Sequence, residues 1–162
     1  MRKLISILFL FTFIYSQELF QFNPTEIAAV MHTARQQFKR RMLVVVQPHR
    51  FTRVSRLMSQ FGSVLAGADE VILTEVYAAG EAPIPGATSK VLAEVIGQFG
   101  ESPVHLVGSL DEAVARAEQL AKPGDLVITF GAGSISGVAG RIFHHLQQRQ
   151  RQNADVVEAN YG

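Results

Sequence analysis

Hydrophobic residues follow two different spacings along most of this chain. Short apolar runs rich in β-branched residues alternate with longer segments in which apolar residues recur at every third or fourth position. The runs are typical of buried strands, and the longer segments are typical of amphipathic helices. The predicted strands cover residues 43–46, 71–74, 103–107 and 126–129. Strands that alternate with helices require right-handed crossovers, so the pattern predicts one α/β domain with a Rossmann-like, doubly wound, mostly parallel sheet.

Two of the predicted helices begin with a capping box, in which a capping side chain and a glutamate three residues later exchange hydrogen bonds with the backbone. Asn23 and Glu26 form the first box, and Ser109 and Glu112 form the second. After the second predicted strand, residues 75–89 make a connection longer than the two to six residues usual in α/β units. Long ordered loops are frequently functional, which makes this loop a candidate part of a site.

The two ends of the chain differ from the α/β region at residues 17–150. Residues 1–16 contain Arg2 and Lys3, an apolar run and then Ser16, an order typical of a signal peptide. Two other interpretations stay open for this segment: a buried edge strand, or foreign sequence from a truncated reading frame. Residues 151–162 are expected to form a polar tail that frays.

Charge and composition exclude several classes of function. The 162 residues include 15 Lys and Arg against 14 Asp and Glu, which gives a formal net charge of +1. No global field therefore favours nucleic acid, so ionic recognition must be local. The absence of cysteine excludes a disulfide framework, a thiolate nucleophile and a cysteine-ligated metal.

The stretch QPHRFTR, at residues 47–53, carries the clearest candidate chemistry. The first strand stops at Gln47-Pro48, so His49, Arg50 and Arg53 follow its carboxyl end, where open α/β sheets bind ligands. Guanidinium groups bind carboxylate or phosphate through paired hydrogen bonds. Basic residues in a first helical turn also oppose the helix dipole, which favours a compensating anion. The alternative is that both arginines are ordinary solvated side chains.

The loop after the second strand carries Glu75, Tyr77 and Glu81. If the first two strands are neighbours in the sheet, this loop lies beside the arginines. The alternative is structural: Tyr77 packs, and the glutamates only pair with Arg50 or Arg53.

Other motifs give weaker signals. Gly131 and Gly133 lie between the last strand and the last helix, where their turn could present backbone N–H groups to an anion. Tight packing between strand and helix is the preferred interpretation. The adjacent His144 and His145 lack the spacing of paired metal ligands on a helix. We therefore predict no metal site, and no residue stands out as catalytic.

Four motifs in order carry a resemblance to a known family. They are PTEI at 24–27, QPHRFTR at 47–53, EVYAAGEAPIPGATSK at 75–90 and GDLVITFGAGSIS at 124–136. From about Pro24 to His145 the chain resembles the C-terminal domain of UDP-N-acetylmuramate:L-alanine ligases, members of the Mur ligase family. These cytoplasmic enzymes are ATP-dependent and make peptidoglycan precursors. Their C-terminal domain is understood to help place the incoming amino acid.

The resemblance turns the anion site into a site for a substrate carboxylate. It implies that Arg50, Arg53, His49, Tyr77 and Glu81 bind UDP-N-acetylmuramate and L-alanine or their product. ATP and Mg²⁺ are also implied, bound mainly by two domains that these 162 residues do not contain.

One departure from the family pattern concerns substrate binding. The family usually has Tyr-Gly-His-His before Pro-Thr-Glu, whereas this chain has Phe20, Gln21, Phe22 and Asn23. A histidine expected to face substrate is therefore missing.

The resemblance and the two missing domains lead to one hypothesis: a truncated or split ligase domain, inactive alone, that needs a chain carrying the other domains. The alternative, which rests on the signal-like segment, is a non-catalytic binding module that is exported or associated with the membrane.

Overall fold

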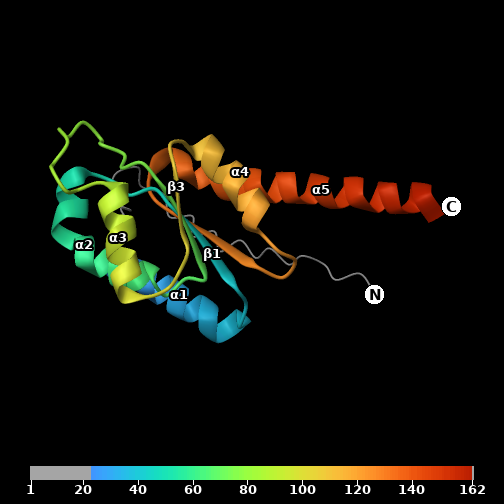
Figure 1. Ribbon diagram of the computed structural model, residues 1–162, viewed down its shortest axis with the longest axis horizontal. Helices are drawn as coiled ribbons and strands as arrows, with labels where there is room; N and C mark the ends of the chain where they lie inside the picture. Colours follow the sequence, from blue (N-terminus) through green and yellow to red (C-terminus); the bar gives the residue numbers. More distant parts are fainter. Residues whose placement is uncertain (1–22, 162) are drawn as a thin grey trace.

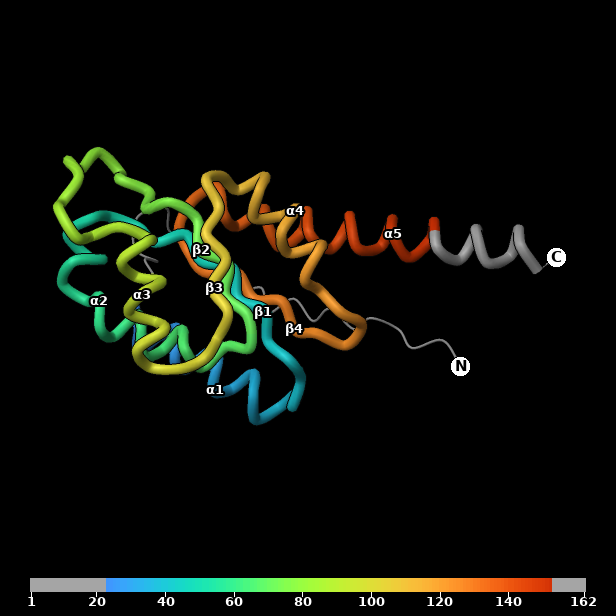
Figure 2. Tube along the Cα trace, in the orientation of Figure 1, coloured from blue at the N-terminus to red at the C-terminus, as the bar shows by residue number. Residues whose placement is uncertain are grey.

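A four-stranded parallel sheet forms the centre of the protein, whose computed structural model describes residues 23–161. The strands are β1 (Met42–Val46), β2 (Glu70–Thr74), β3 (Val104–Val107) and β4 (Leu126–Phe130). Their order is β3-β2-β1-β4, and Figure 2 shows the strands at the centre of the domain with helices around them. The chain thus builds outward from β1 to β3 and then returns to place β4 on the other side of β1. This reversal creates a topological switch point between β1 and β4, the usual ligand position in such sheets.

Helices cover both faces of the sheet, which confirms the predicted doubly wound α/β fold (Figure 1). One face packs against α1 (Pro24–Phe38), α2 (Phe51–Leu65) and α3 (Ser89–Phe99). The other face packs against α4 (Leu110–Leu120) and α5 (Val138–Tyr161), the second of which follows the 3₁₀ helix η1 (Gly133–Gly137). Val44 and Val46 point into the first core, and Leu43 and Val45 into the second. This alternation explains why β1 is apolar at every position.

The structure confirms the capping box of α1 and modifies that of α4. The Asn23 side chain accepts from the Glu26 N–H at 3.0 Å, and Glu26 accepts from the Asn23 N–H at 2.8 Å. At α4, Ser109 accepts from the Glu112 N–H at 3.1 Å, but the Glu112 carboxylate accepts from the N–H of Gly108 at 2.8 Å. The glutamate therefore serves the residue before the cap, not the cap itself.

The last helix is longer than the sequence pattern suggests. α5 continues to Tyr161, through most of the segment expected to fray, and projects beyond the body of the domain (Figure 1). No proline or glycine occurs between Arg141 and Tyr161, so no residue breaks the helix. The signal-like segment and the replaced histidine motif at 20–22 lie outside the described residues.

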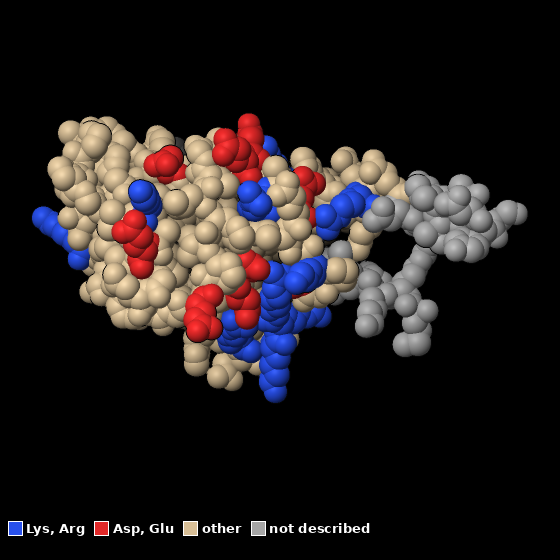
Figure 3. Space-filling view, viewed as in Figure 1, with Lys and Arg blue, Asp and Glu red and all other residues tan. Residues whose placement is uncertain are grey.

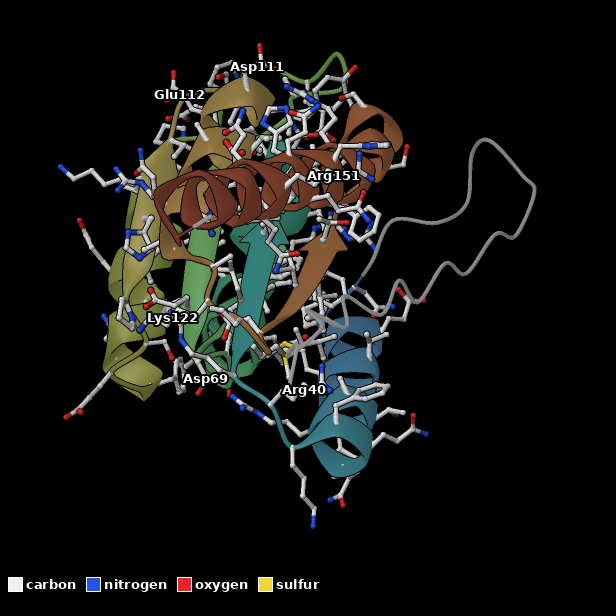
Figure 4. The ribbon with its side chains drawn as sticks, turned by 90° about the vertical axis from the view of Figure 1, so that its right-hand side faces the viewer. Arg40, Asp69, Asp111, Glu112, Lys122 and Arg151 are labelled. Carbon is white, nitrogen blue, oxygen red and sulfur yellow. The ribbon has the colours of Figure 1, made fainter. Side chains whose placement is uncertain are left out.

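An ionic network closes the amino ends of the strands. Arg41 donates to the carboxylates of Asp125 and Glu70, and His105 bonds the second oxygen of Glu70 at 2.8 Å. Lys and Arg side chains gather beside α1 in this region, interspersed with acidic ones (Figure 3). Asp69 and Lys122 lie at this end, opposite Asp111 and Glu112 (Figure 4). The network belongs to the end of the sheet away from the candidate site.

Candidate functional site

Two loops meet at the carboxyl ends of β1 and β2. The N–H of Tyr77 donates to the carbonyl of Pro48, and the N–H of Arg50 donates to the carbonyl of Tyr77, both at 2.8 Å. These bonds form an isolated bridge between His49 and Tyr77, whose rings stack with centroids 5.4 Å apart. The predicted proximity of the two loops is therefore confirmed. Tyr77 stays about half exposed on one side of this contact.

Arg50 occupies the N-cap position of α2 in an unusual backbone conformation. Its φ of 66° lies in the region that favours glycine. A non-glycine residue in this region costs about 1–3 kcal/mol and persists only where its surroundings hold it there. Strain of this kind concentrates at ligand sites, and the guanidinium of Arg50 is exposed. The backbone thus points independently to the residue that the sequence singled out.

Glu81 reaches across from the loop between β2 and α3 to the first turn of α2. Its carboxylate accepts from the Thr52 N–H at 2.9 Å and from the Thr52 hydroxyl at 2.7 Å. It also lies 4.0 Å from Nη1 of Arg50. The hydrogen bonds from Thr52 hold the pKa of Glu81 below its ordinary value. Both carboxylate oxygens therefore already have partners within the protein.

A small pocket opens at the switch point between β1 and β4. Its volume is about 20 Å³, enough for about one water molecule. The polar lining comes from Gln47, His49 and Arg53. The rest of the lining is Ile27, Val46, Pro48, Phe61, Phe130, Gly131 and Ala132. This pocket is therefore too small to enclose an amino acid or a nucleotide within the described residues.

Two polar atoms at this pocket are buried without a hydrogen-bond partner: Oε1 of Gln47 and Nδ1 of His49. Such atoms are costly inside a protein, and a water molecule or a ligand atom in the pocket would satisfy them. Burial lowers the pKa of His49, and the charges of Arg50 and Arg53 lower it further. The imidazole is therefore neutral near pH 7. Sequence reasoning did not select Gln47, although its position at the end of a buried strand was the available signal.

Gly131 is required by close packing. Its φ is 156°, and a Cβ here would lie 2.7 Å from Cγ2 of Ile135 and 3.1 Å from the carbonyl oxygen of Gln47. Gly133 has a φ of 68° and opens the 3₁₀ turn that follows. The close packing of strand and helix, preferred from the sequence, accounts for Gly131.

The two histidines of α5 lie away from this pocket. Nδ1 of His145 is 3.0 Å from Oε1 of Glu118 on α4, so this pair joins two helices at the surface. His144 contacts the ring of Phe143 edge-on. Within residues 23–152, whose side chains are described, no group of three or more His, Asp or Glu side chains is arranged to hold a metal ion. No helix in this part of the chain is long and apolar enough to cross a membrane.

Comparison with known proteins identifies the family. Residues 22–133 match the family described as Mur ligase, glutamate ligase domain. The chain belongs to this family. It is 45% identical over 136 residues to the UDP-N-acetylmuramate–L-alanine ligase of Rhodospirillum rubrum, and 42% identical over 126 residues to that of Anaeromyxobacter dehalogenans. These matches cover 80% and 78% of the chain but only 28% and 27% of the relatives, so this Mur ligase domain spans about a quarter of their length.

Solved structures show the same fold. The UDP-N-acetylmuramate-alanine ligase MurC of Thermotoga maritima superposes with a TM-score of 0.58 at 25% identity, covering 78% of the chain and 25% of that protein. A separate domain from a putative UDP-N-acetylmuramate:L-alanyl-gamma-D-glutamyl-diaminopimelate ligase of Haemophilus ducreyi gives 0.55 at 25% identity, covering 76% and 84%. The chain therefore corresponds to the C-terminal domain of MurC-type ligases.

Proposed function

We propose that this Mur ligase domain positions the amino acid in the ligation of L-alanine to UDP-N-acetylmuramate, a step of peptidoglycan precursor synthesis. The observation that carries the proposal is the placement of Arg50 and Arg53 beside the carboxyl end of β1, in a chain 42–45% identical to enzymes of that name. Two guanidinium groups there suit the carboxylate of L-alanine or of the alanylated product.

Holding the carboxylate also orients the rest of the amino acid. A carboxylate held by Arg50 and Arg53 would leave the amine of L-alanine available for attack on the activated muramoyl group, which other domains of the ligase would supply. His49 stays neutral and keeps Nδ1 at the pocket, and its ring rests on Tyr77. In this arrangement His49 and Tyr77 form the side wall of the amino-acid site. The chain's own contribution is orientation, which acts by fixing the reacting atoms in place.

ATP and Mg²⁺, which the family implies, do not fit the described residues. The side chains described, those of residues 23–152, include no acidic or histidine cluster for a metal ion, and a pocket of about 20 Å³ is far too small for a nucleotide. We assign both, together with the UDP-sugar site, to domains outside these 162 residues, on this or another polypeptide. The domain alone is expected to bind ligand without ligating it.

A binding experiment tests the proposal. Wild-type protein is titrated with UDP-N-acetylmuramoyl-L-alanine and followed by calorimetry and by NMR. Arg50→Ala and Arg53→Ala should each weaken binding roughly tenfold, the effect of losing about one charge-assisted hydrogen bond. Arg116→Ala is the matched control, because Arg116 is exposed on α4 across the sheet. Absence of saturable binding, or arginine variants that bind like wild type, would contradict the proposal.

A second candidate is a non-catalytic binding module that is exported or associated with the membrane. The observation that favours it is the basic and then apolar run in residues 1–16. Mass spectrometry of the N-terminus in the native cell discriminates the two. Cleavage near Ser16 in an exported fraction supports the module, whereas an intact Met1 to Ser16 on cytoplasmic protein contradicts it.

A further inference from the structure

Helix α2 begins without a cap of its own. Arg50, at the N-cap, makes no side-chain hydrogen bond to the first turn, and that turn contains no acidic residue. The first N–H groups of a helix have no partner inside it, and the positive charges of Arg50 and Arg53 oppose the dipole there. The start of α2 is therefore the kind of helix end that needs an acceptor from elsewhere.

Glu81 supplies that acceptor from 29 residues away in sequence. One carboxylate oxygen takes the N–H of Thr52, and the other takes its hydroxyl. The tight turn that presents Glu81 has an unusual backbone, with positive φ at Ala79 (50°) and Gly80 (83°) and an N–H bond from Glu81 to the carbonyl of Ala78. The strained turn at Ala79 suggests that the placement of Glu81 matters more than the cost of the turn.

Backbone hydrogen bonds hold Arg50 on both sides. Its N–H donates to the carbonyl of Tyr77 at 2.8 Å, and its carbonyl accepts from the N–H of Val54 at 3.1 Å. Two residues later, the N–H and the hydroxyl of Thr52 donate to the carboxylate of Glu81. Since a positive φ at arginine persists only where the surroundings impose it, these bonds explain how Arg50 keeps a φ of 66°.

We propose that Glu81 is a positioning residue: it caps α2 from the neighbouring loop and thereby fixes Arg50 for recognition of a carboxylate. This inference rests on the proposed function. It adds that Arg50 and Glu81, which the sequence places in one predicted substrate site, have different roles there. Glu81 is negatively charged and bonded through both oxygens, so it suits a support of the site better than a ligand of an anionic group. Arg50 contacts the ligand, and Glu81 acts through Arg50.

The cap is tested without ligand. In ¹⁵N NMR, the amide of Thr52 should shift as Glu81 titrates, and its hydrogen exchange should accelerate in Glu81→Ala. Glu81→Gln keeps one acceptor oxygen but loses the charge, so exchange should accelerate less. Glu112→Ala is the matched control, because Glu112 also accepts a backbone N–H at a helix start, but on α4, across the sheet from α2. It should leave the Thr52 amide unchanged.

The positioning role is tested by a double-mutant cycle on affinity for UDP-N-acetylmuramoyl-L-alanine. Glu81→Ala alone should weaken binding roughly five- to tenfold, about the effect of one lost charge-assisted interaction. In an Arg50→Ala background it should weaken binding no further, because the residue through which it acts is gone. Glu112→Ala should leave affinity unchanged in both backgrounds.

The outcomes separate this inference from the proposed function. Additive effects of Glu81→Ala and Arg50→Ala would show that Glu81 does not act through Arg50 and would overturn the inference. An unchanged Thr52 amide in Glu81→Ala and Glu81→Gln would overturn the cap itself, whatever binds. A wild-type domain that binds no ligand while its Thr52 amide follows Glu81 would remove the proposed function and the carboxylate step, and leave the cap as a structural contact.

Discussion

At the scale of single residues, His49 is the group whose charge state depends most clearly on its surroundings. Burial and then the charges of Arg50 and Arg53 lower its pKa from 6.5. We expect Arg50→Ala to raise the His49 pKa, because one of the opposing charges is removed. NMR titration of the imidazole measures this, and Arg116→Ala should leave the pKa unchanged. A wild-type His49 that titrates at or above 6.5 would contradict the expectation.

The direction of this shift also determines how His49 affects stability. The folded state binds its proton less readily than the unfolded state. The free energy of unfolding should therefore fall as the pH drops from 6.5 through the lowered pKa, and level off below it. His49→Gln should reduce this part of the pH dependence.

Gly131 tests the close packing at the switch point. A methyl group there would meet Ile135 and the backbone of Gln47, at a φ that favours glycine. We expect Gly131→Ala to lower the free energy of unfolding by about 2–4 kcal/mol through overpacking and strain. Gly140→Ala is the control, because Gly140 lies in α5 with open space around it and alanine favours helix by about 0.5–1 kcal/mol. Urea denaturation of both variants measures the contrast, and equal effects would contradict it.

At the scale of elements, the buried strands and amphipathic helices were predictable because burial imposes a period on the sequence. The switch point followed from the strand order, which the sequence did not specify. The pairing of Glu81 with Thr52 was not predictable, because it depends on the positive φ values at Ala79 and Gly80 across a long loop. Basic residues at the start of α2 indicated that an anion compensates them, and the structure supplies one from within the protein.

Buried and exposed ion pairs between the helices and strands should differ greatly in their contribution to stability. Arg41 bonds Asp125, whose side chain is 6% exposed, and also Glu70. Arg41→Ala leaves both carboxylates without this partner, so we expect a loss of about 3 kcal/mol. Arg141→Ala breaks an exposed pair with Asp111, 83% exposed, and should cost about 0.5 kcal/mol or less. Thermal and urea unfolding measure the difference, and similar losses in the two variants would contradict it.

The stability that the network around Arg41 contributes should also depend on pH. Burial opposes ionisation of Glu70, but hydrogen bonds from His105 and Arg41 outweigh it and hold the pKa of Glu70 below its ordinary value. The stability that this carboxylate contributes is therefore present above the ordinary glutamate pKa and lost as the pH falls through the lowered one. Arg41→Ala should diminish that loss on acidification.

At the scale of the whole molecule, the site and the projecting end of α5 should be independent of each other. Leu146 is the last buried residue of the helix within the part whose side chains are described, and Arg149 donates to the carbonyl of Glu118 on α4 at 2.6 Å. Removing residues 151–162 should leave the melting temperature within about 2 °C of the full chain, because Arg151 and Gln152 are exposed and α5 projects beyond the body of the domain here (Figure 1). Ligand affinity should not change.

A longer deletion, which removes a buried residue of α5, should in contrast destabilise the protein. Removing residues 146–162 takes away Leu146, which is 3% exposed, together with the Arg149 contacts to α4. We expect it to lower the free energy of unfolding by about 3 kcal/mol, as for loss of a buried leucine, and to leave the arginine loop in place. Calorimetry and ¹⁵N spectra compare both deletions with the full chain. If the deletion of residues 151–162 unfolds the protein or shifts the NMR signal of the Thr52 amide, those residues are part of the Mur ligase domain and not an extension of it.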